Sequence, residues 1–124
     1  MGKNIKTIED LRNNGFDVDM ALHFCANKES IYRAVLDTAL QEGREKLEVL
    51  RKYVTEENYK RYYIEVHAVK NVANTIGASQ LFKIALADNE AMKKSDYEYT
   101  RAHYEELLKE YKRVLDVIED FLNE

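Results

Sequence analysis

The residues best suited to chemistry are a histidine and a lysine three positions apart, His67 and Lys70. A neutral imidazole has a ring nitrogen with a free lone pair, which can attack a phosphoryl phosphorus without an activating triad. Residues three apart are neighbours on a helix, so the Lys70 ammonium can balance charge on the phosphoryl oxygens. The spacing alone does not distinguish this pair from an ordinary exposed histidine and lysine.

The neighbours of His67 predict that it lies at the edge of a helix's buried stripe. Apolar or small residues recur every three or four positions at Tyr59, Tyr62, Val66, Val69, Ala73 and Ile76. His67 follows Val66 by one residue, which turns it about 100° away from that stripe. We therefore expect His67 and Lys70 to carry the chemistry at the surface. The side chains expected to form a partner-docking surface around them are Tyr63, Ile64, Ala68, Asn71 and Asn74.

The whole chain has the composition of an all-α protein. It contains no proline and four glycines, and the apolar residues keep helical spacing. The predicted helices cover residues 17–25, about 27–53, 55–77, 78–94 and 97 almost to 124, with Asp17, Asn27 and Thr55 as N-caps. Short connections favour an antiparallel up-down-up-down four-helix bundle with a short extra N-terminal helix. Residues 1–14 are polar and predict a loosely held lead-in segment, which leaves 15–124 as one bundle domain.

The string from His67 to Ala78, HAVKNVANTIGA, resembles the signature of histidine-containing phosphotransfer (HPt) domains. The likeness covers roughly residues 15–122. It implies a phosphorelay intermediate of two-component signal transduction, which accepts a phosphoryl group on His67 from a receiver-domain phospho-aspartate and passes it to another receiver aspartate. Asn71 stands where family members often have glycine or a small residue, and its amide could crowd a receiver or hydrogen-bond the phosphoryl group.

The resemblance also implies the partners and cofactors. The partners would be response-regulator receiver domains and, if the chain belongs to such a system, a hybrid sensor histidine kinase. The chain itself would need no cofactor and no metal, because the required Mg²⁺ belongs to the receiver. The sequence has no glycine-rich phosphate loop, so we expect a carrier without ATP-dependent kinase activity of its own.

Composition argues against several other function classes. The net charge is −4, and the 19 Lys and Arg are scattered among 23 Asp and Glu, which disfavours nucleic-acid binding. No apolar run approaches the roughly 20 residues of a membrane span, and no signal peptide is recognisable. We therefore expect a cytoplasmic protein. We also expect a monomer. The single cysteine, Cys25, excludes an internal disulfide and is expected to be buried.

Two alternatives use the same helical fold. A di-metal carboxylate centre needs Glu-x-x-His pairs, but the residues three positions before His23, His67 and His103 are Met20, Ile64 and Thr100. The metal alternative is therefore disfavoured. A non-catalytic helical bundle that docks receiver domains without transferring phosphate stays open, because fold alone does not determine function.

Overall fold

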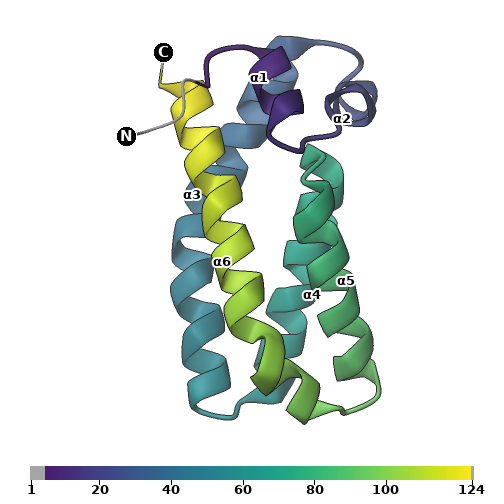
Figure 1. The fold of residues 1–124 in the computed structure, drawn as a ribbon, viewed down its shortest axis with the longest axis vertical. Helices are drawn as coiled ribbons and strands as arrows, with labels where there is room; N and C mark the ends of the chain where they lie inside the picture. The colour runs from purple at the N-terminus through teal and green to yellow at the C-terminus, as the bar shows by residue number, and fades with distance from the viewer. Residues whose placement is uncertain (1–4, 124) are drawn as a thin grey trace.

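The computed structural model describes residues 5–123, and within that range the chain forms helices and no strand (Figure 1). The helices are α1 (Ile8–Asn13), α2 (Val18–Phe24), α3 (Glu29–Thr55), α4 (Tyr59–Ile76), α5 (Ser79–Lys93) and α6 (Tyr97–Leu122). The predicted all-α class is confirmed.

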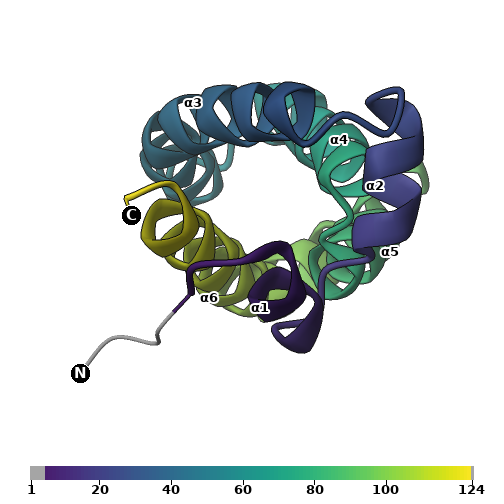
Figure 2. The same ribbon diagram turned by 90° about the horizontal axis from the view of Figure 1, so that it is seen from above.

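The four long helices lie side by side along the long axis of the molecule and surround one core (Figures 1 and 2). Helix α4 packs against α3 and α5, and α6 packs against α5 and α3. The short helices α1 and α2 lie across one end of this arrangement (Figure 2). The core contains fully buried aromatic and aliphatic side chains from most of the helices, among them Tyr32, Tyr62, Leu81, Leu107 and Phe121.

Helix α1 is the main departure from the sequence prediction, which placed a loosely held lead-in over residues 1–14. Thr7 and Asp10 form a capping box: the Thr7 hydroxyl accepts from the Asp10 amide at 3.1 Å, and the Asp10 carboxylate accepts from the Thr7 amide. Leu11 of this helix is fully buried in the core. The described part of the segment is therefore folded, while residues 1–4 of the predicted lead-in lie outside the described residues.

The N-terminal boundary of α4 differs from the predicted one. Thr55, the expected cap, is the last residue of α3, and the cap of α4 is Asn58, whose side chain accepts from the Arg61 amide. Between them, Glu57 has a left-handed backbone with φ of 55°. The turn therefore takes three residues that the pattern had assigned to the following helix.

A tight contact fixes the C-terminal end of α4 against the start of α2. Gly77 caps α4 in the left-handed conformation, with φ of 82°, and its carbonyl accepts from the Asp17 amide at 2.7 Å. A Cβ on Gly77 would lie 2.6 Å from the Asp17 carbonyl oxygen, so a side chain has no room there. The predicted roles of Gly77 as a helix end and of Asp17 as the α2 cap are confirmed.

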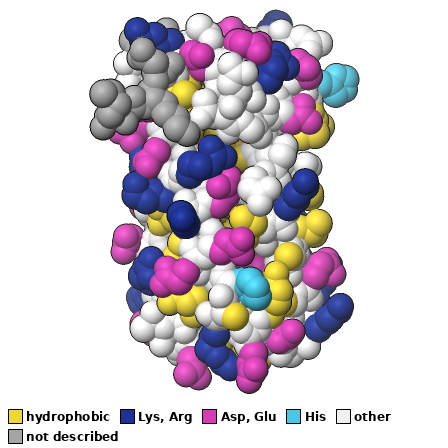
Figure 3. Space-filling model, viewed as in Figure 1, with side chains coloured by type: hydrophobic (Ala, Val, Ile, Leu, Met, Phe, Trp, Pro, Cys, Tyr) yellow, Lys and Arg dark blue, Asp and Glu magenta, His cyan; other side chains and the backbone are white. Residues whose placement is uncertain are grey.

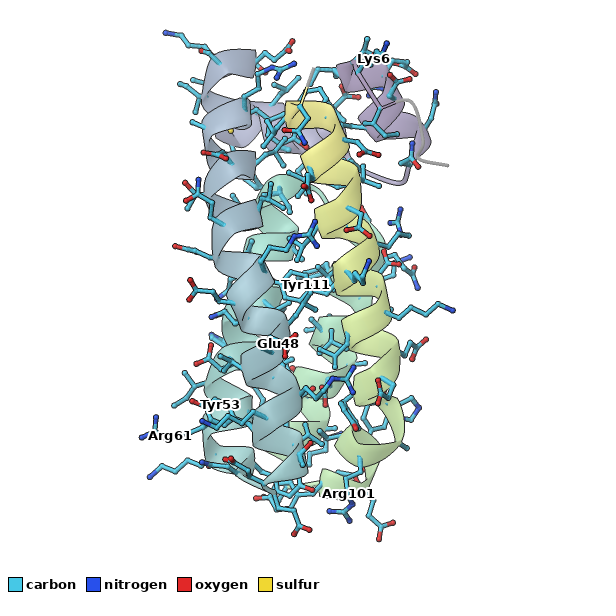
Figure 4. All side chains as sticks on the ribbon, turned by 90° about the vertical axis from the view of Figure 1, so that its left-hand side faces the viewer. Lys6, Glu48, Tyr53, Arg61, Arg101 and Tyr111 are labelled. Carbon is cyan, nitrogen blue, oxygen red and sulfur yellow. The ribbon has the colours of Figure 1, made fainter. Side chains whose placement is uncertain are left out.

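Gly43 does not interrupt α3, although glycine weakens helix propensity. It is buried where α3 meets α6, and a Cβ at this position would lie 2.6 Å from Leu115 Cδ2. The Tyr111 side chain points into the same space between α3 and α6 (Figure 4), and its hydroxyl would be 3.1 Å from that Cβ. Gly43 therefore allows a close approach of two long helices.

Candidate functional site

His67 lies on the solvent-facing side of α4, next to the fully buried Val66. Its ring is exposed, and the nearest aromatic ring on the helix is that of Tyr63, with centroids 6.4 Å apart and planes tilted by 49°. Within residues 5–123 the His67 ring forms no hydrogen bond and no ion pair. A ring nitrogen can therefore meet an external electrophile without first breaking a bond inside the protein.

Lys70 lies one helical turn beyond His67 and is partly exposed. Side chains at this spacing have Cβ atoms about 5–6 Å apart, so a flexible ammonium can reach groups attached to the His67 ring. Among the described residues, Lys70 has no acidic partner. Its charge is therefore available to a phosphoryl group or to another anion that approaches His67.

The five predicted docking residues all reach the surface of α4. Ile64 is 60% exposed, and Asn71 and Asn74 are also exposed. Tyr63 and Ala68 are half-buried at the two margins of this face. The predicted position of Ile64 outside the core is confirmed, while the docking role of the five residues stays a prediction.

Hollows flank this face on both sides. Between α3 and α4 runs a groove of about 570 Å³, lined mainly by apolar or small side chains that include Ile31, Ala34, Val35 and Val72, with Asn71 on its wall. On the other side, Asn74 borders a hollow of about 250 Å³ between α2, α4 and α5. The face around His67 therefore lies between two depressions, and the larger one places apolar surface beside the histidine.

The charges around the molecule are mixed in sign. Acidic and basic side chains alternate over the face shown in Figure 3, without an extended basic area. In the described range, no three His, Cys, Asp or Glu side chains are grouped closely enough to hold a metal ion. No helix formed by residues 5–123 has the length and apolar character needed to cross a membrane.

The two other histidines and the single cysteine of the chain have ordinary environments. His23 is exposed on α2, whereas His103 is partly buried, stacked on Tyr99 at 4.0 Å between ring centroids. The Nδ1 atom of His103 lies 2.8 Å from the Tyr99 carbonyl oxygen. Cys25 is buried, as its apolar neighbours predicted.

A buried polar cluster between α4, α5 and α6 is the feature that the sequence pattern did not predict. Tyr62 of α4 and Thr100 of α6 donate hydrogen bonds to the two oxygens of Asp88 on α5, the Thr100 bond at 2.6 Å. Asp88 is 2% exposed, and burial raises the pKa of its carboxyl above the ordinary value, although both hydrogen bonds act in the opposite direction. We call Tyr62, Asp88 and Thr100 the Asp88 cluster.

A sequence signal for the Asp88 cluster exists. Asp88 follows Ala85 by three residues and precedes Met92 by four, so it lies on the buried stripe of α5. The adjacent Asn89 is fully buried too, and neither polar atom of its side chain has a hydrogen-bond partner among the described residues. Helical spacing alone therefore predicts that Asp88 is buried. Its charge predicts the opposite, because charged residues are seldom fully buried.

The chain was compared with models of known protein families, with curated proteins and with solved structures, and none of them matches it. The function therefore has to be inferred from the residues of α4 and their surroundings.

Proposed function

We propose that the protein is an HPt-type phosphorelay intermediate: an up-down-up-down four-helix bundle that carries a phosphoryl group on His67 between receiver-domain aspartates. The observation that carries the proposal is the exposed His67 ring on the outer side of α4, which forms no hydrogen bond or ion pair within residues 5–123 and lies one turn from Lys70, which has no acidic partner in that range. The resemblance of the string from His67 to Ala78 to the HPt signature supports the same assignment.

The proposed transfer is a simple displacement at phosphorus. A ring nitrogen of His67 attacks the phosphorus of a receiver phospho-aspartate, an N–P bond forms, and the P–O bond to the aspartate breaks. The aspartate carboxylate leaves with the electron pair, and the reverse displacement loads a second receiver. In this proposal the Lys70 ammonium balances charge on the phosphoryl oxygens, and the Mg²⁺ that such transfers require comes with the receiver.

The partner in this proposal is a protein, so the surface around His67 has to accept one. Ile64 supplies exposed apolar area, and the groove between α3 and α4 continues this area beyond Asn71. Receiver domains of response regulators, or of a hybrid sensor kinase, are the proposed partners. The monomer is proposed to act in the cytoplasm, where these partners are found.

The decisive experiment is incubation of the protein with a receiver domain phosphorylated on aspartate, in the presence of Mg²⁺. We expect acid-labile, base-stable phosphate on the protein, as a phosphohistidine requires. His67→Gln should abolish the label, whereas His23→Gln, which removes another exposed histidine, should keep it. Label that persists in His67→Gln, or that is lost in His23→Gln, would show that the assigned site is wrong.

A second function, receiver docking without transfer, uses the same surface. The observation that favours it is Asn71, a larger amide than the family usually has one turn from His67 and on the wall of the apolar groove. Binding of a phosphorylated receiver without label on His67 would support docking alone. Asn71→Gly should then restore transfer if the amide is the obstruction.

A further inference from the structure

Two fully buried side-chain hydrogen bonds hold α4 to its neighbours within residues 5–123. The Tyr32 hydroxyl of α3 donates to the Ile76 carbonyl at 2.8 Å, near the C-terminal end of α4. The Tyr62 hydroxyl donates to Asp88 of α5, near the N-terminal end of α4. His67 lies on α4 between these two attachments.

The Asp88 cluster constrains α4 in a way that apolar packing does not. Apart from the Tyr32 hydrogen bond to the Ile76 carbonyl at its far end, the core contacts of α4 are apolar, through residues such as Val66, Val69 and Ala73, and have no strong directional preference. A hydrogen bond to a carboxylate requires a short distance and a narrow range of angles. Asp88 is also hydrogen-bonded by Thr100 of α6, so its own position is fixed from a third helix.

Rotation of α4 about its axis would break the Tyr62 hydrogen bond inside the core. A buried carboxyl that loses a partner there cannot replace it with water, so the rotation is costly. Tyr63 and Ile64 follow Tyr62 directly in the chain, and His67 is five residues further along. The orientation of the outer face of α4 near Tyr63, Ile64 and His67 is therefore coupled to this buried contact, while the Tyr32 hydrogen bond holds the far end of the helix.

We propose that Asp88 is a positioning residue, which fixes the rotation of α4 through Tyr62 and so determines the direction in which His67 faces. The consequence for phosphotransfer rests on the proposed function. The orientation of His67 itself can be measured without any transfer.

The experiment compares Asp88→Leu, Asp88→Asn and Asn89→Leu with the unmodified protein. Asn89→Leu is the matched control, because it makes the same apolar replacement at the neighbouring buried position, where no hydrogen bond to another described residue is lost. The first measurement is the NMR signal of the His67 ring carbon and its proton, identified by its absence in His67→Gln. The second is amide hydrogen exchange over residues 62–70 of α4.

We expect Asp88→Leu to move the His67 ring signal and to raise amide exchange over residues 62–70 about tenfold or more. Asp88→Asn has the same shape: its amide oxygen can accept from Tyr62, and its NH2 group can donate to the Thr100 hydroxyl, whose own hydrogen can point to Met92 Sδ at 3.1 Å. It should therefore restore both measurements toward those of the unmodified protein. Asn89→Leu should change neither. If Asp88→Leu does not fold, Tyr62→Phe removes the same hydrogen bond and keeps the ring, and it should produce the same two changes.

The proposal is overturned if Asp88→Leu gives the same His67 ring signal and the same amide exchange over residues 62–70 as the control Asn89→Leu. Where Asp88→Leu does not fold, the same criterion applies to Tyr62→Phe. The proposal is also overturned if Asp88→Asn fails to restore both measurements. Failure of the unmodified protein to accept phosphate would overturn the proposed function alone, because neither measurement uses a receiver. Where transfer occurs, its rate should fall in Asp88→Leu and recover in Asp88→Asn.

Discussion

At the scale of single residues, Lys70 offers the clearest test of electrostatic assistance at His67. Lys70→Ala should slow phosphotransfer from a receiver about tenfold, which is less than the loss of a donor in a buried site because solvent screens an exposed charge. The protein should keep its thermal stability, since the variant removes no fully buried side chain. Transfer is measured by single-turnover labelling at low salt.

Lys109→Ala is the control for Lys70→Ala, because it removes an exposed lysine from α6, away from the His67 face. It should leave the labelling rate unchanged. Equal rates for Lys70→Ala and the unmodified protein at low salt would argue against any role for Lys70.

Ile64 tests the docking surface at the same scale. Ile64→Asp should weaken receiver binding at least about tenfold, because it replaces apolar contact area with a charge that must be desolvated. Thermal stability should be nearly unchanged, since the side chain is 60% exposed. Ala102→Asp adds the same charge at an exposed position on α6 and should bind normally. Normal binding by Ile64→Asp would place the docking surface elsewhere.

At this scale the sequence predicted the exposed site better than the buried one. His67 and Ile64 are exposed because they are rotated away from the apolar stripe of α4. That stripe can be recognised from the sequence of the helix alone. The Asp88 cluster could not be predicted with its partners, because the pairing of Tyr62, Asp88 and Thr100 depends on how three helices align. Periodicity within one helix carries no information on that alignment.

At the scale of helices, Gly43 should be restricted to glycine by the α3–α6 contact. Gly43→Ala is expected to lower the free energy of unfolding by about 1–3 kcal/mol, because the added Cβ overlaps Leu115. In a Leu115→Ala background the overlap with Leu115 is removed and the 3.1 Å approach of the Tyr111 hydroxyl remains, so the same change should cost less, by about 1 kcal/mol or more. Chemical denaturation of the four proteins measures both effects, and an equal cost of Gly43→Ala in both backgrounds would contradict the packing argument.

Helix ends show where local sequence signals suffice and where they do not. Asp17 and Asp96 cap α2 and α6 through their own carboxylates, and both positions are recognisable from residue type. Asn27 was predicted to cap α3 but has a left-handed backbone with φ of 59°, and Lys28 takes the cap position without a side-chain bond. Asparagine favours both conformations, so only the path of the chain between packed helices decides which one it adopts.

At the scale of the whole molecule, Asp88 makes stability depend on pH. Burial raises the pKa of its carboxyl in the folded protein above the value of about 3.9 expected for an unfolded chain. The folded state therefore holds this proton more tightly than the unfolded state does. The resulting contribution to stability is fully present below about pH 3.9 and is lost as the pH rises through the folded-state pKa.

Carboxylates with a lowered pKa make stability depend on pH in the opposite direction. For Asp116, the hydrogen bonds from Lys112 and Arg44 outweigh the effect of partial burial and hold its pKa below the ordinary value. Such a group stabilises the folded state above the pKa of the unfolded chain, and that contribution is lost as the pH falls. The pH profile of the unmodified protein is a sum of both kinds, so a single profile cannot identify Asp88.

The difference between variants isolates each group. Asp88→Asn cannot titrate, and its stability relative to the unmodified protein should rise with pH from about pH 4 and level off above the folded-state pKa of Asp88, with a slope of at most about 1.4 kcal/mol per pH unit. The stability of Asp116→Asn relative to the unmodified protein should instead fall as the pH rises. Urea denaturation at pH values from 3 to 9 gives both differences. A flat or falling difference for Asp88→Asn would show that folding does not favour the protonated carboxyl, and that the Tyr62 and Thr100 hydrogen bonds outweigh its burial.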